Sequence, residues 1–303
     1  MKGENTMING KSIFSWNIPA VGGGDPEAFV TFLLENNFEG VCLKGANGPW
    51  VQKIKRWSPW PRWGENIRPE MIKALKDAGL KLYLWHFVFG QDPAGELDIA
   101  LSQTARFEPD GYIWDVETAF DSKVGAVGNA RYLARGFKKV FPQLEQALCW
   151  WALPLSPKGG EWHPIKVANA FQETVDLAMP MMYWQGKGAL AAVTYLHRSL
   201  KIYSKFWNKP IVPVGRAYNG DGGYGDAAGI TAFAREVMSL SEGVAAIPGI
   251  SWWVTDKAVK NPAWLIALQH TETFDAVEPI KLTPEQMLDR LVEGHPRLFP
   301  ELN

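Results

Sequence analysis

The stretch RPEMIKALKDAGLKLYLWHFVFG, Arg68 to Gly90, joins two different hydrophobic patterns. In its first half the apolar residues recur at intervals of three and four, which predicts an amphipathic helix. From Leu80 onward the residues form an almost continuous apolar run, as expected of a parallel strand that helices cover on both faces. The stretch therefore predicts a helix followed by a buried strand, the repeating unit of an α/β fold.

The same alternation extends along most of the chain. Eight short apolar runs are separated by amphipathic stretches, and eight such units in about 270 residues match the usual size of a (β/α)8 TIM barrel. An open, doubly wound sheet is the competing arrangement, but VGGGDPEA after the first run lacks the spacing and context of a dinucleotide-binding turn. The runs begin at Ser12, Gly40, Leu80, Gly111, Ala147, Asp176, Pro210 and Gly249.

The end of the chain changes character. We expect a TIM-barrel domain at 1–272 and a short C-terminal extension or linker at 273–303. The segment LTPEQMLDRLVEGH within it predicts one amphipathic helix, which either packs on the barrel or leads to an adjoining module.

Composition excludes several classes of protein. The 303 residues are 47% hydrophobic and 21% charged, which is typical of a globular protein with a large core. The net charge is −1 and no long block of like charge occurs, so a nucleic-acid partner is not indicated. No apolar run approaches the roughly 20 residues of a membrane span, and the opening MKGENTMING lacks the apolar stretch of a secretion signal. We expect a soluble protein without a membrane span, and its compartment stays open.

Cysteine and tryptophan usage bear on the kind of site. Cys42 and Cys149 each lie in an apolar run, which favours buried thiols over a disulfide or a zinc site. No serine elbow, HExxH motif or metal-ligand spacing is found, so we expect no cofactor and no metal ion. The chain has 15 tryptophans, whose flat rings and N–H groups suit a surface that grips sugar rings.

Two carboxylates, Asp115 and Glu117, end the apolar run GYIWDVE. The carboxyl ends of barrel strands are where active sites form. Residues two apart on a strand share a face, and placing both acids in the barrel mouth leaves Trp114 and Val116 under the helices. Two neighbouring acids in a partly dry mouth titrate apart, so one of them can hold a proton to donate near neutral pH. The structural alternative is a salt-bridge network with Lys44 or Arg216.

The run DGYIWDVE resembles the strand-four signature of glycoside hydrolase family 18, the chitinase-like barrels. The pattern of that family is Asp-Gly-aromatic-Asp-x-Asp-x-Glu. Asp110, Asp115 and Glu117 match it, whereas Ile113 stands where the family has another Asp. A bare Asp-x-Glu also resembles glycoside hydrolase family 25, the lysozyme-like barrels, but that family opens with an Asp where this chain has Asn17.

Two further stretches carry the family 18 resemblance. MPMMYWQ resembles the strand-six pattern Met-x-Tyr-Asp, with Tyr183 in register and Trp184 where Asp is usual. GISWWVTD resembles the Gly-x-x-x-Trp floor of strand eight, which points to Trp253 as the floor residue and leaves Trp252 as the alternative.

The resemblance implies a retaining glycosidase that cleaves β-linked N-acetylhexosamine polymers such as peptidoglycan or chitin. It implies that Glu117 is the general acid, that Asp115 orients the acetamido group of the substrate and that Tyr183 hydrogen-bonds that group. A glycan substrate is the expected partner, and an adjoining cell-wall-binding module is compatible with it. The alternative is a non-catalytic carbohydrate-binding barrel, because Ile113 and Trp184 replace two acids of the family, although retention of Glu117 favours an enzyme.

Other candidate substrate-binding residues belong to predicted loops and strand ends. In GANGPWVQKIKRWSPWPRWGEN, tryptophans alternate with helix-breaking prolines, which favours a sugar platform over the alternative of simple packing on the barrel. The glycine-rich RAYNGDGGYGD favours a mobile substrate loop over a phosphate site or a calcium site at Asn219 and Asp221. The predicted substrate-binding residues are Trp60, His86, Trp151, Trp184, Arg216, Tyr218, Asp221, Trp252 and Trp253.

Overall fold

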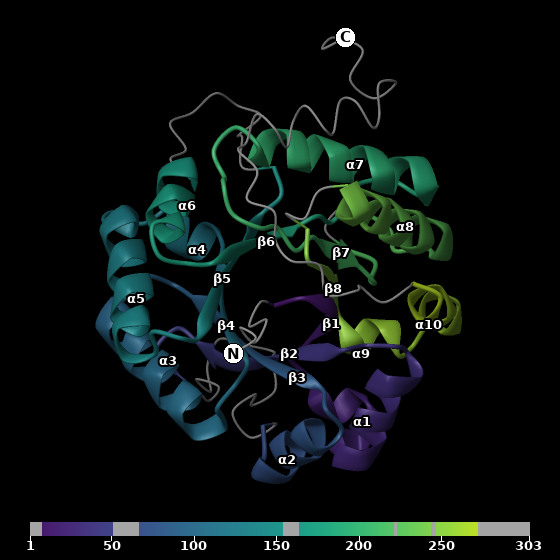
Figure 1. Ribbon diagram of the computed structural model, residues 1–303, viewed down its shortest axis with the longest axis horizontal. Coiled ribbons are helices and arrows are strands. Elements are labelled where there is room, and N and C mark those ends of the chain that lie inside the picture. Colours follow the sequence, from purple (N-terminus) through teal and green to yellow (C-terminus); the bar gives the residue numbers. More distant parts are fainter. Residues whose placement is uncertain (1–7, 51–66, 154–163, 221–222, 244–246, 272–303) are drawn as a thin grey trace.

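The computed structural model describes residues 8–50, 67–153, 164–220, 223–243 and 247–271. Eight parallel strands close into a barrel in sequence order, and helices surround it (Figure 1). The predicted TIM barrel is confirmed, and the open doubly wound sheet is excluded. The strands are β1 Gly10–Ser15, β2 Gly40–Asn47, β3 Lys81–Val88, β4 Gly111–Val116, β5 Glu145–Trp151, β6 Leu177–Met181, β7 Val214–Arg216 and β8 Gly249–Trp253.

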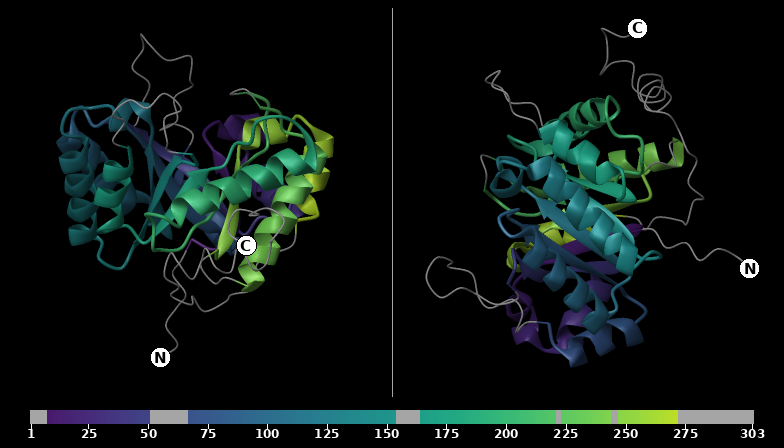
Figure 2. Two further views of the ribbon diagram at one scale, coloured as in Figure 1. Left: turned by 90° about the horizontal axis from the view of Figure 1, so that it is seen from above. Right: turned by 90° about the vertical axis from the view of Figure 1, so that its left-hand side faces the viewer.

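The helices form the outer layer of the molecule. α3 packs against α5 and α5 against α6 on one side, whereas α8 packs against α7 and α10 on the other (Figure 2). None of the described helices is both long enough and apolar enough to cross a bilayer. The helices are α1 Pro26–Glu35, α2 Pro69–Asp77, α3 Pro93–Phe107, α4 Thr118–Asp121, α5 Ala126–Val140, α6 Pro164–Gln172, α7 Gly188–Tyr203, α8 Ala227–Gly243, α9 Thr255–Ala258 and α10 Pro262–Gln269.

The stretch that begins at Arg68 folds as the sequence predicts. α2 starts with a proline at its first position, where the missing N–H costs nothing, and buries Met71, Ile72 and Leu75 against the core. Gly79 then takes a φ of 72°, a left-handed conformation that glycine adopts without strain, and the chain turns directly into β3. The helix-to-strand turn therefore follows from a single glycine.

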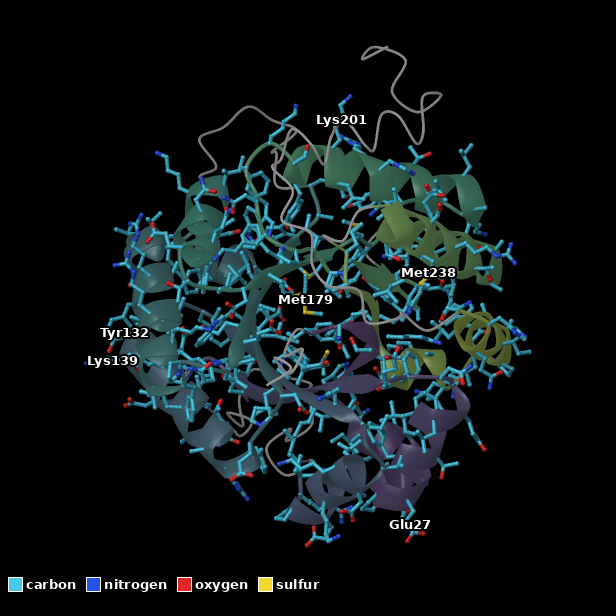
Figure 3. All side chains as sticks on the ribbon, in the orientation of Figure 1. Glu27, Tyr132, Lys139, Met179, Lys201 and Met238 are labelled. Atoms are coloured by element: carbon cyan, nitrogen blue, oxygen red, sulfur yellow. The ribbon has the colours of Figure 1, made fainter. Side chains whose placement is uncertain are left out.

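Alternate side chains of the strands belong to two separate apolar clusters. An outer cluster joins strand residues such as Trp114 and Val116 to the helices. An inner cluster fills the barrel, with Met179 near its centre, while Glu27 and Lys139 project from the periphery (Figure 3). The inner cluster includes Phe14, Cys42, Tyr83, Trp85, Ile113, Ala147, Cys149, Leu177, Met179, Met181, Val212 and Val214.

Candidate active site

The two acids stand at the carboxyl end of β4. Ile113 lies in the inner cluster, whereas Trp114 and Val116 lie in the outer one. Because side chains alternate along a strand, Asp115 and Glu117 share the inner face with Ile113. Glu117 directly precedes α4, and its backbone oxygen accepts hydrogen bonds from the first turn of that helix. The pair thus lies at the end of the barrel where βα loops begin.

Asp115 is almost completely buried, with only 4% of the residue exposed. Burial is therefore the main influence on its ionisation. Its pKa lies well above the ordinary range because of burial first and the charge of Glu117 second, while Lys44 and a hydrogen bond with Cys149 act in the opposite direction. Among the described residues its Oδ1 has no hydrogen-bond partner. The protonated form is therefore favoured, and one oxygen is left for a ligand.

Lys44 supplies the positive charge of the site. It extends from β2, is 9% exposed, and places its Nζ 4.3 Å from the ring centroid of Trp85 and 5.4 Å from that of Phe87. Burial lowers its pKa to about 8, and the charges of Asp115 and Glu117 oppose that fall. The sequence indicated Lys44 only as a salt-bridge partner of the acids. Its position two residues after Cys42 in a buried strand was the signal that it shares the inner face.

Cys149 lies beside the acid pair on β5. Its Cα is in register with that of Asp115, and its thiol forms a hydrogen bond with that carboxyl group. Burial, followed by the charges of Asp115 and Glu117, raises the pKa of the thiol well above its usual range. Cys42 and Cys149 are both free and buried, as the sequence predicts, so Cys149 acts here as a neutral hydrogen-bonding group.

An aromatic cluster forms the floor of the mouth. The ring of Trp253 lies 5.6 Å from that of Phe14 and 5.4 Å from that of Trp85, and Trp253 is half-buried. Trp252 is fully buried on the opposite face, where its ring lies 5.7 Å from that of Phe233 in α8. The structure thus places Trp253 in the mouth and Trp252 under a helix, and a substrate contact by Trp252 is not supported by this position.

The same division separates Tyr183 from Trp184. Tyr183 is half-buried beside the inner cluster, and its ring stands 5.4 Å from that of Tyr218 at 87°. Burial, then the neighbouring Cys149, Tyr218 and the two acids, raises the pKa of Tyr183 well above its usual range, so its hydroxyl keeps its proton. Trp184 is fully buried with its ring 5.3 Å from that of Phe233, away from the mouth.

Trp151 lies at the rim, at the end of β5. Its Nε1 donates a hydrogen bond of 3.0 Å to Asp121 of α4, the short helix that follows Glu117. The ring is half-buried and packs against both apolar clusters. Trp151 is therefore near the acid pair and partly accessible to a ligand.

His86 lies outside the mouth, on the outer face of β3. It is fully buried, with ring nitrogens 3.0 Å from the Tyr112 hydroxyl and 2.8 Å from the Gly48 carbonyl oxygen. Burial lowers its pKa to about 3, so the ring is neutral. His86 was predicted to face the cleft. The structure places it on the outer face instead, because Trp85 and Phe87 occupy the inner face of this strand.

Arg216 is also enclosed, beneath the loop that follows β7. It is fully buried, its Nη2 donates to the Gly220 carbonyl oxygen at 2.9 Å, and its guanidinium carbon lies 4.7 Å from the centroid of the Tyr218 ring. A direct substrate contact by Arg216 is not supported by this position. The predicted residues Trp60 and Asp221 lie outside the described residues.

Metal binding has no candidate centre in the described ranges, where no three His, Cys, Asp or Glu side chains are close enough to hold an ion. In the strand-seven loop, the Asn219 side-chain oxygen is engaged by the backbone N–H of Gly225 at 3.0 Å. The Asp226 carboxylate accepts hydrogen bonds from the backbone N–H groups of Gly188 and Gly229. It thereby links the first turns of α7 and α8.

Solved structures resemble this barrel, although no protein-family model and no curated protein matches the sequence. A family 18 chitinase from Pseudoalteromonas aurantia superposes with a TM-score of 0.60 at 15% identity, covering 86% of this chain and 100% of that one. Active domain 2 of a chitinase from Pyrococcus furiosus, studied as catalytic-site mutants, gives 0.58 at 10% identity, covering 86% and 93%. The spore cortex-lytic enzyme SleL of Bacillus megaterium gives 0.56 at 11% identity, covering 90% and 75%.

The barrel is similar in fold to these three structures, the first of which is a glycoside hydrolase family 18 chitinase. The predicted resemblance to that family is confirmed at the level of fold, since identities this low carry no more than that. The weaker resemblance to family 25 finds no support in these three structures.

Proposed function

We propose that this protein is a glycoside hydrolase that cleaves β-linked N-acetylhexosamine polymers, either chitin or peptidoglycan. The observation that carries the proposal is the pair Asp115 and Glu117 on the inner face of β4, above an aromatic floor that contains Trp253. Fold alone does not assign an activity, so the argument rests on what these side chains can do. The fold neighbours named as chitinases and as a spore cortex-lytic enzyme support the choice of substrate class.

In the proposed reaction Glu117 donates its proton to the glycosidic oxygen as the bond to the anomeric carbon breaks. The acetamido oxygen of the same sugar attacks that carbon, which gives a cyclic intermediate. Water then attacks the anomeric carbon, Glu117 takes a proton from that water, and the ring opens. Two inversions at one carbon retain its configuration, so the enzyme is proposed to be retaining.

Asp115 and Tyr183 are proposed to hold the acetamido group. Oδ1 of Asp115, which lacks a hydrogen-bond partner among the described residues, is available to the amide of the sugar. The Tyr183 hydroxyl, which keeps its proton, can donate to the acetamido oxygen. Burial favours protonated Asp115, and its Oδ1 can still accept a hydrogen bond from the amide N–H as that amide becomes positively charged.

Lys44 compensates for charge in the proposed site. The family pattern has an Asp where this chain has Ile113, so Asp115 has an apolar residue next to it on the inner face. An apolar neighbour disfavours the charged form, and burial is the first cause that raises the pKa of Asp115. The ammonium group of Lys44 limits that rise and stabilises whichever acid is ionised.

A non-catalytic glycan-binding barrel is the second candidate, because Ile113 and Trp184 replace two acids and Trp184 lies under a helix. Incubation with purified peptidoglycan and with chitin oligomers, followed by mass analysis of the products, separates the two. Hydrolysis of either polymer supports the enzyme. Binding without any product would replace the enzyme with a lectin, and an adjoining cell-wall-binding module beyond the barrel is compatible with both.

A further inference from the structure

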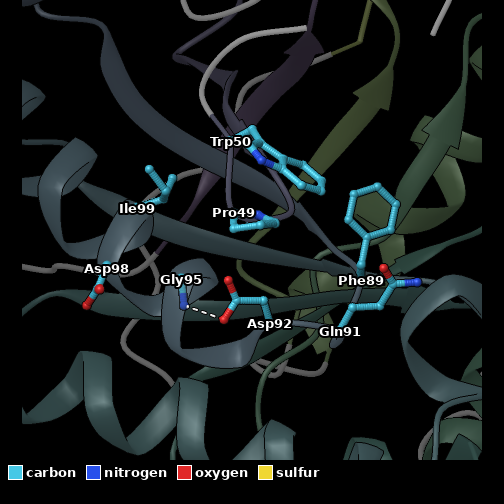
Figure 4. A pocket seen from close by; sticks show the side chains of 8 residues that line it. All are labelled: Pro49, Trp50, Phe89, Gln91, Asp92, Gly95, Asp98 and Ile99. Carbon is cyan, nitrogen blue, oxygen red and sulfur yellow. Dashed lines mark hydrogen bonds between the residues drawn. The ribbon is translucent and has the colours of Figure 1, made fainter. Parts of the chain in front are cut away.

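A second cavity lies on the same end of the barrel as the acid pair but is formed by different residues. Its volume is about 450 Å³, and it is bounded by the turn after β2, the turn after β3 and the start of α3 (Figure 4). Trp50 and Phe89 supply its aromatic surface, and Asp92 and Asp98 supply its charge. None of the residues that line it belongs to the proposed reaction centre.

One wall of this cavity is the turn from Asn47 to Trp50. The backbone N–H of Asn47 donates to the Trp50 carbonyl oxygen at 2.9 Å, and that of Gly48 donates to the Phe87 carbonyl oxygen at 2.7 Å. His86 also donates from Nε2 to the carbonyl oxygen of Gly48, because a carbonyl oxygen only accepts. The buried histidine thus holds the turn that presents Trp50.

The opposite wall is the turn that carries Phe89. Glu96 is fully buried and accepts hydrogen bonds from the backbone N–H groups of Phe89, at 2.8 Å, and Gly90, at 3.0 Å. Asn129 donates to the carbonyl oxygen of Gly90 at 3.0 Å. Both walls are therefore fixed by side chains that the proposed reaction does not use, which is what a preformed binding site requires.

A line of rings connects the cavity with the acid pair. The Trp50 ring lies 6.2 Å from that of Phe89, which lies 5.2 Å from that of Phe87. Phe87 is in register with Asp115 across the β3–β4 pair and also contacts the ammonium group of Lys44. A glycan bound at the mouth would therefore meet a continuous aromatic surface that leads into the cavity.

The described residues that line the cavity carry negative charge. Asp92 and Asp98 are both exposed, and within the described residues neither forms an ion pair. Asp92 caps α3 by accepting from the Gly95 N–H at 3.0 Å, whereas the Asp98 carboxylate has no hydrogen bond or ion pair to the described residues. Trp50, 40% exposed, lines the same cavity. This combination is complementary to a ring-shaped ligand that carries a positive charge.

We propose that this cavity is an accessory subsite for a sugar unit that carries a protonated amine, as a de-N-acetylated hexosamine does. The proposal rests on the proposed function, because it assumes that the substrate is an N-acetylhexosamine polymer. In this proposal the sugar ring stacks on Trp50 and its ammonium group pairs with Asp98, both of which line the cavity. The protein then selects partly de-N-acetylated chains: Asp115 requires an acetamido group where the bond is cut, and the cavity favours a free amine elsewhere on the chain.

The test measures dissociation constants of two chitin oligomers of equal length, one fully acetylated and one with a free amine. It uses Glu117→Gln protein, in which hydrolysis is suppressed, at a pH where the amine is protonated. We expect the aminated oligomer to bind about twofold to fivefold more tightly, the range of a solvent-exposed ion pair, and the preference to fall in high salt. Asp98→Asn should remove the preference and leave affinity for the acetylated oligomer unchanged. Trp50→Ala should weaken the binding of both oligomers.

Glu27→Gln is the matched control, because it removes an equally exposed carboxylate from a helix outside the cavity, and it should keep the preference. A preference that survives Asp98→Asn, or no binding of either oligomer, would overturn the proposal. A second pair of ligands, muropeptides with a free or an acetylated stem-peptide amine, tests the other source of an ammonium group. Discrimination in that pair alone would reject the sugar. Product formed by Glu117→Gln at nearly the wild-type rate would count against the proposed function and not against the cavity.

Discussion

The two faces of β3, β4 and β5 bury polar groups in different ways. On the outer face both nitrogens of His86 are hydrogen-bonded, and the Gln146 side chain accepts from Trp114 at 2.8 Å and donates to the Ala134 carbonyl oxygen at 3.2 Å. On the inner face Oδ1 of Asp115 has no partner among the described residues.

An unsatisfied buried oxygen costs stability, whereas a satisfied one costs little. The outer groups therefore specify how helices and loops sit on the barrel. Oδ1 of Asp115 bears a cost that a hydrogen bond from a ligand would relieve. The indole N–H groups of Trp184 and Trp252, under the helices, also lack a partner among the described residues, so an unsatisfied atom marks a candidate functional group only where it faces the mouth.

Glu117→Gln should have the largest effect. It removes a proton donor and leaves a side chain of the same shape, so turnover should fall by roughly a hundredfold to ten-thousandfold with folding intact. Steady-state rates on chitin oligomers, with the unfolding temperature as a check, measure this. Glu27→Gln, an exposed acid on α1, should leave the rate unchanged. A nearly wild-type rate for Glu117→Gln would remove this residue from the mechanism.

The tryptophan pair at the end of β8 tests the contrast directly. Trp253→Ala should weaken binding of the oligomers by about tenfold to a hundredfold, because the ring forms the floor of the mouth. Trp252→Ala should instead lower the free energy of unfolding by about 3 to 5 kcal/mol, since it leaves a cavity against α8. Affinity measured on the folded fraction should not change for Trp252→Ala. An equal loss of affinity in both variants would mean that the two faces do not divide these roles.

Lys44→Met should move the pH dependence. Removing the ammonium group takes away the charge that lowers the pKa of Asp115, so the acid pair keeps its protons to higher pH. The profile of kcat/KM should shift upward by about one pH unit. The kcat/KM of wild-type protein should also change near pH 8, where Lys44 loses its proton, and the profile of the variant should lack that change. Lys139→Met, an exposed lysine on α5, is the control, and a shift to lower pH would contradict this account.

The smallest change is expected for Ile113→Asp, which restores the acid of the family pattern below Asp115. A like charge nearby disfavours ionisation, so the optimum should rise by less than about one pH unit while activity persists. The pH profile and the unfolding temperature of the variant measure this together. A pH profile identical to that of the wild type would show that Ile113 does not set the environment of Asp115.

Periodicity was sufficient to predict the barrel, because helices and buried parallel strands differ in the spacing of their apolar residues. Alternation also predicts the side of Asp115 and Glu117, since Trp114 and Val116 between them are too apolar for the mouth. The same rule divides the pairs Tyr183–Trp184 and Trp252–Trp253, although both members of each pair were predicted to contact substrate. Adjacent residues on a strand point to opposite faces, so only one member of each pair reaches the mouth.

Other parts of the site depend on contacts between strands and were not predictable from one sequence. The proximity of Lys44 to Asp115 depends on how β2, β3 and β4 are placed side by side. The outer position of His86 depends on where β3 starts, and a shift of one residue would have reversed it. The cavity at Trp50 is formed by two turns and the start of a helix that are distant in the sequence. Each of them has the sequence pattern of an ordinary loop or helix start.

The stereochemistry of the product tests the central claim most directly. Proton NMR during the first minutes of chitin-oligomer hydrolysis distinguishes the two anomers of the new reducing end before they equilibrate. The account predicts that the β-anomer forms first and that a thiazoline mimic of the cyclised sugar inhibits its formation, because the acetamido group held by Asp115 and Tyr183 performs the attack. The α-anomer as first product, without inhibition by the thiazoline, would mean that water attacks the substrate directly, and would contradict the proposed roles of both residues.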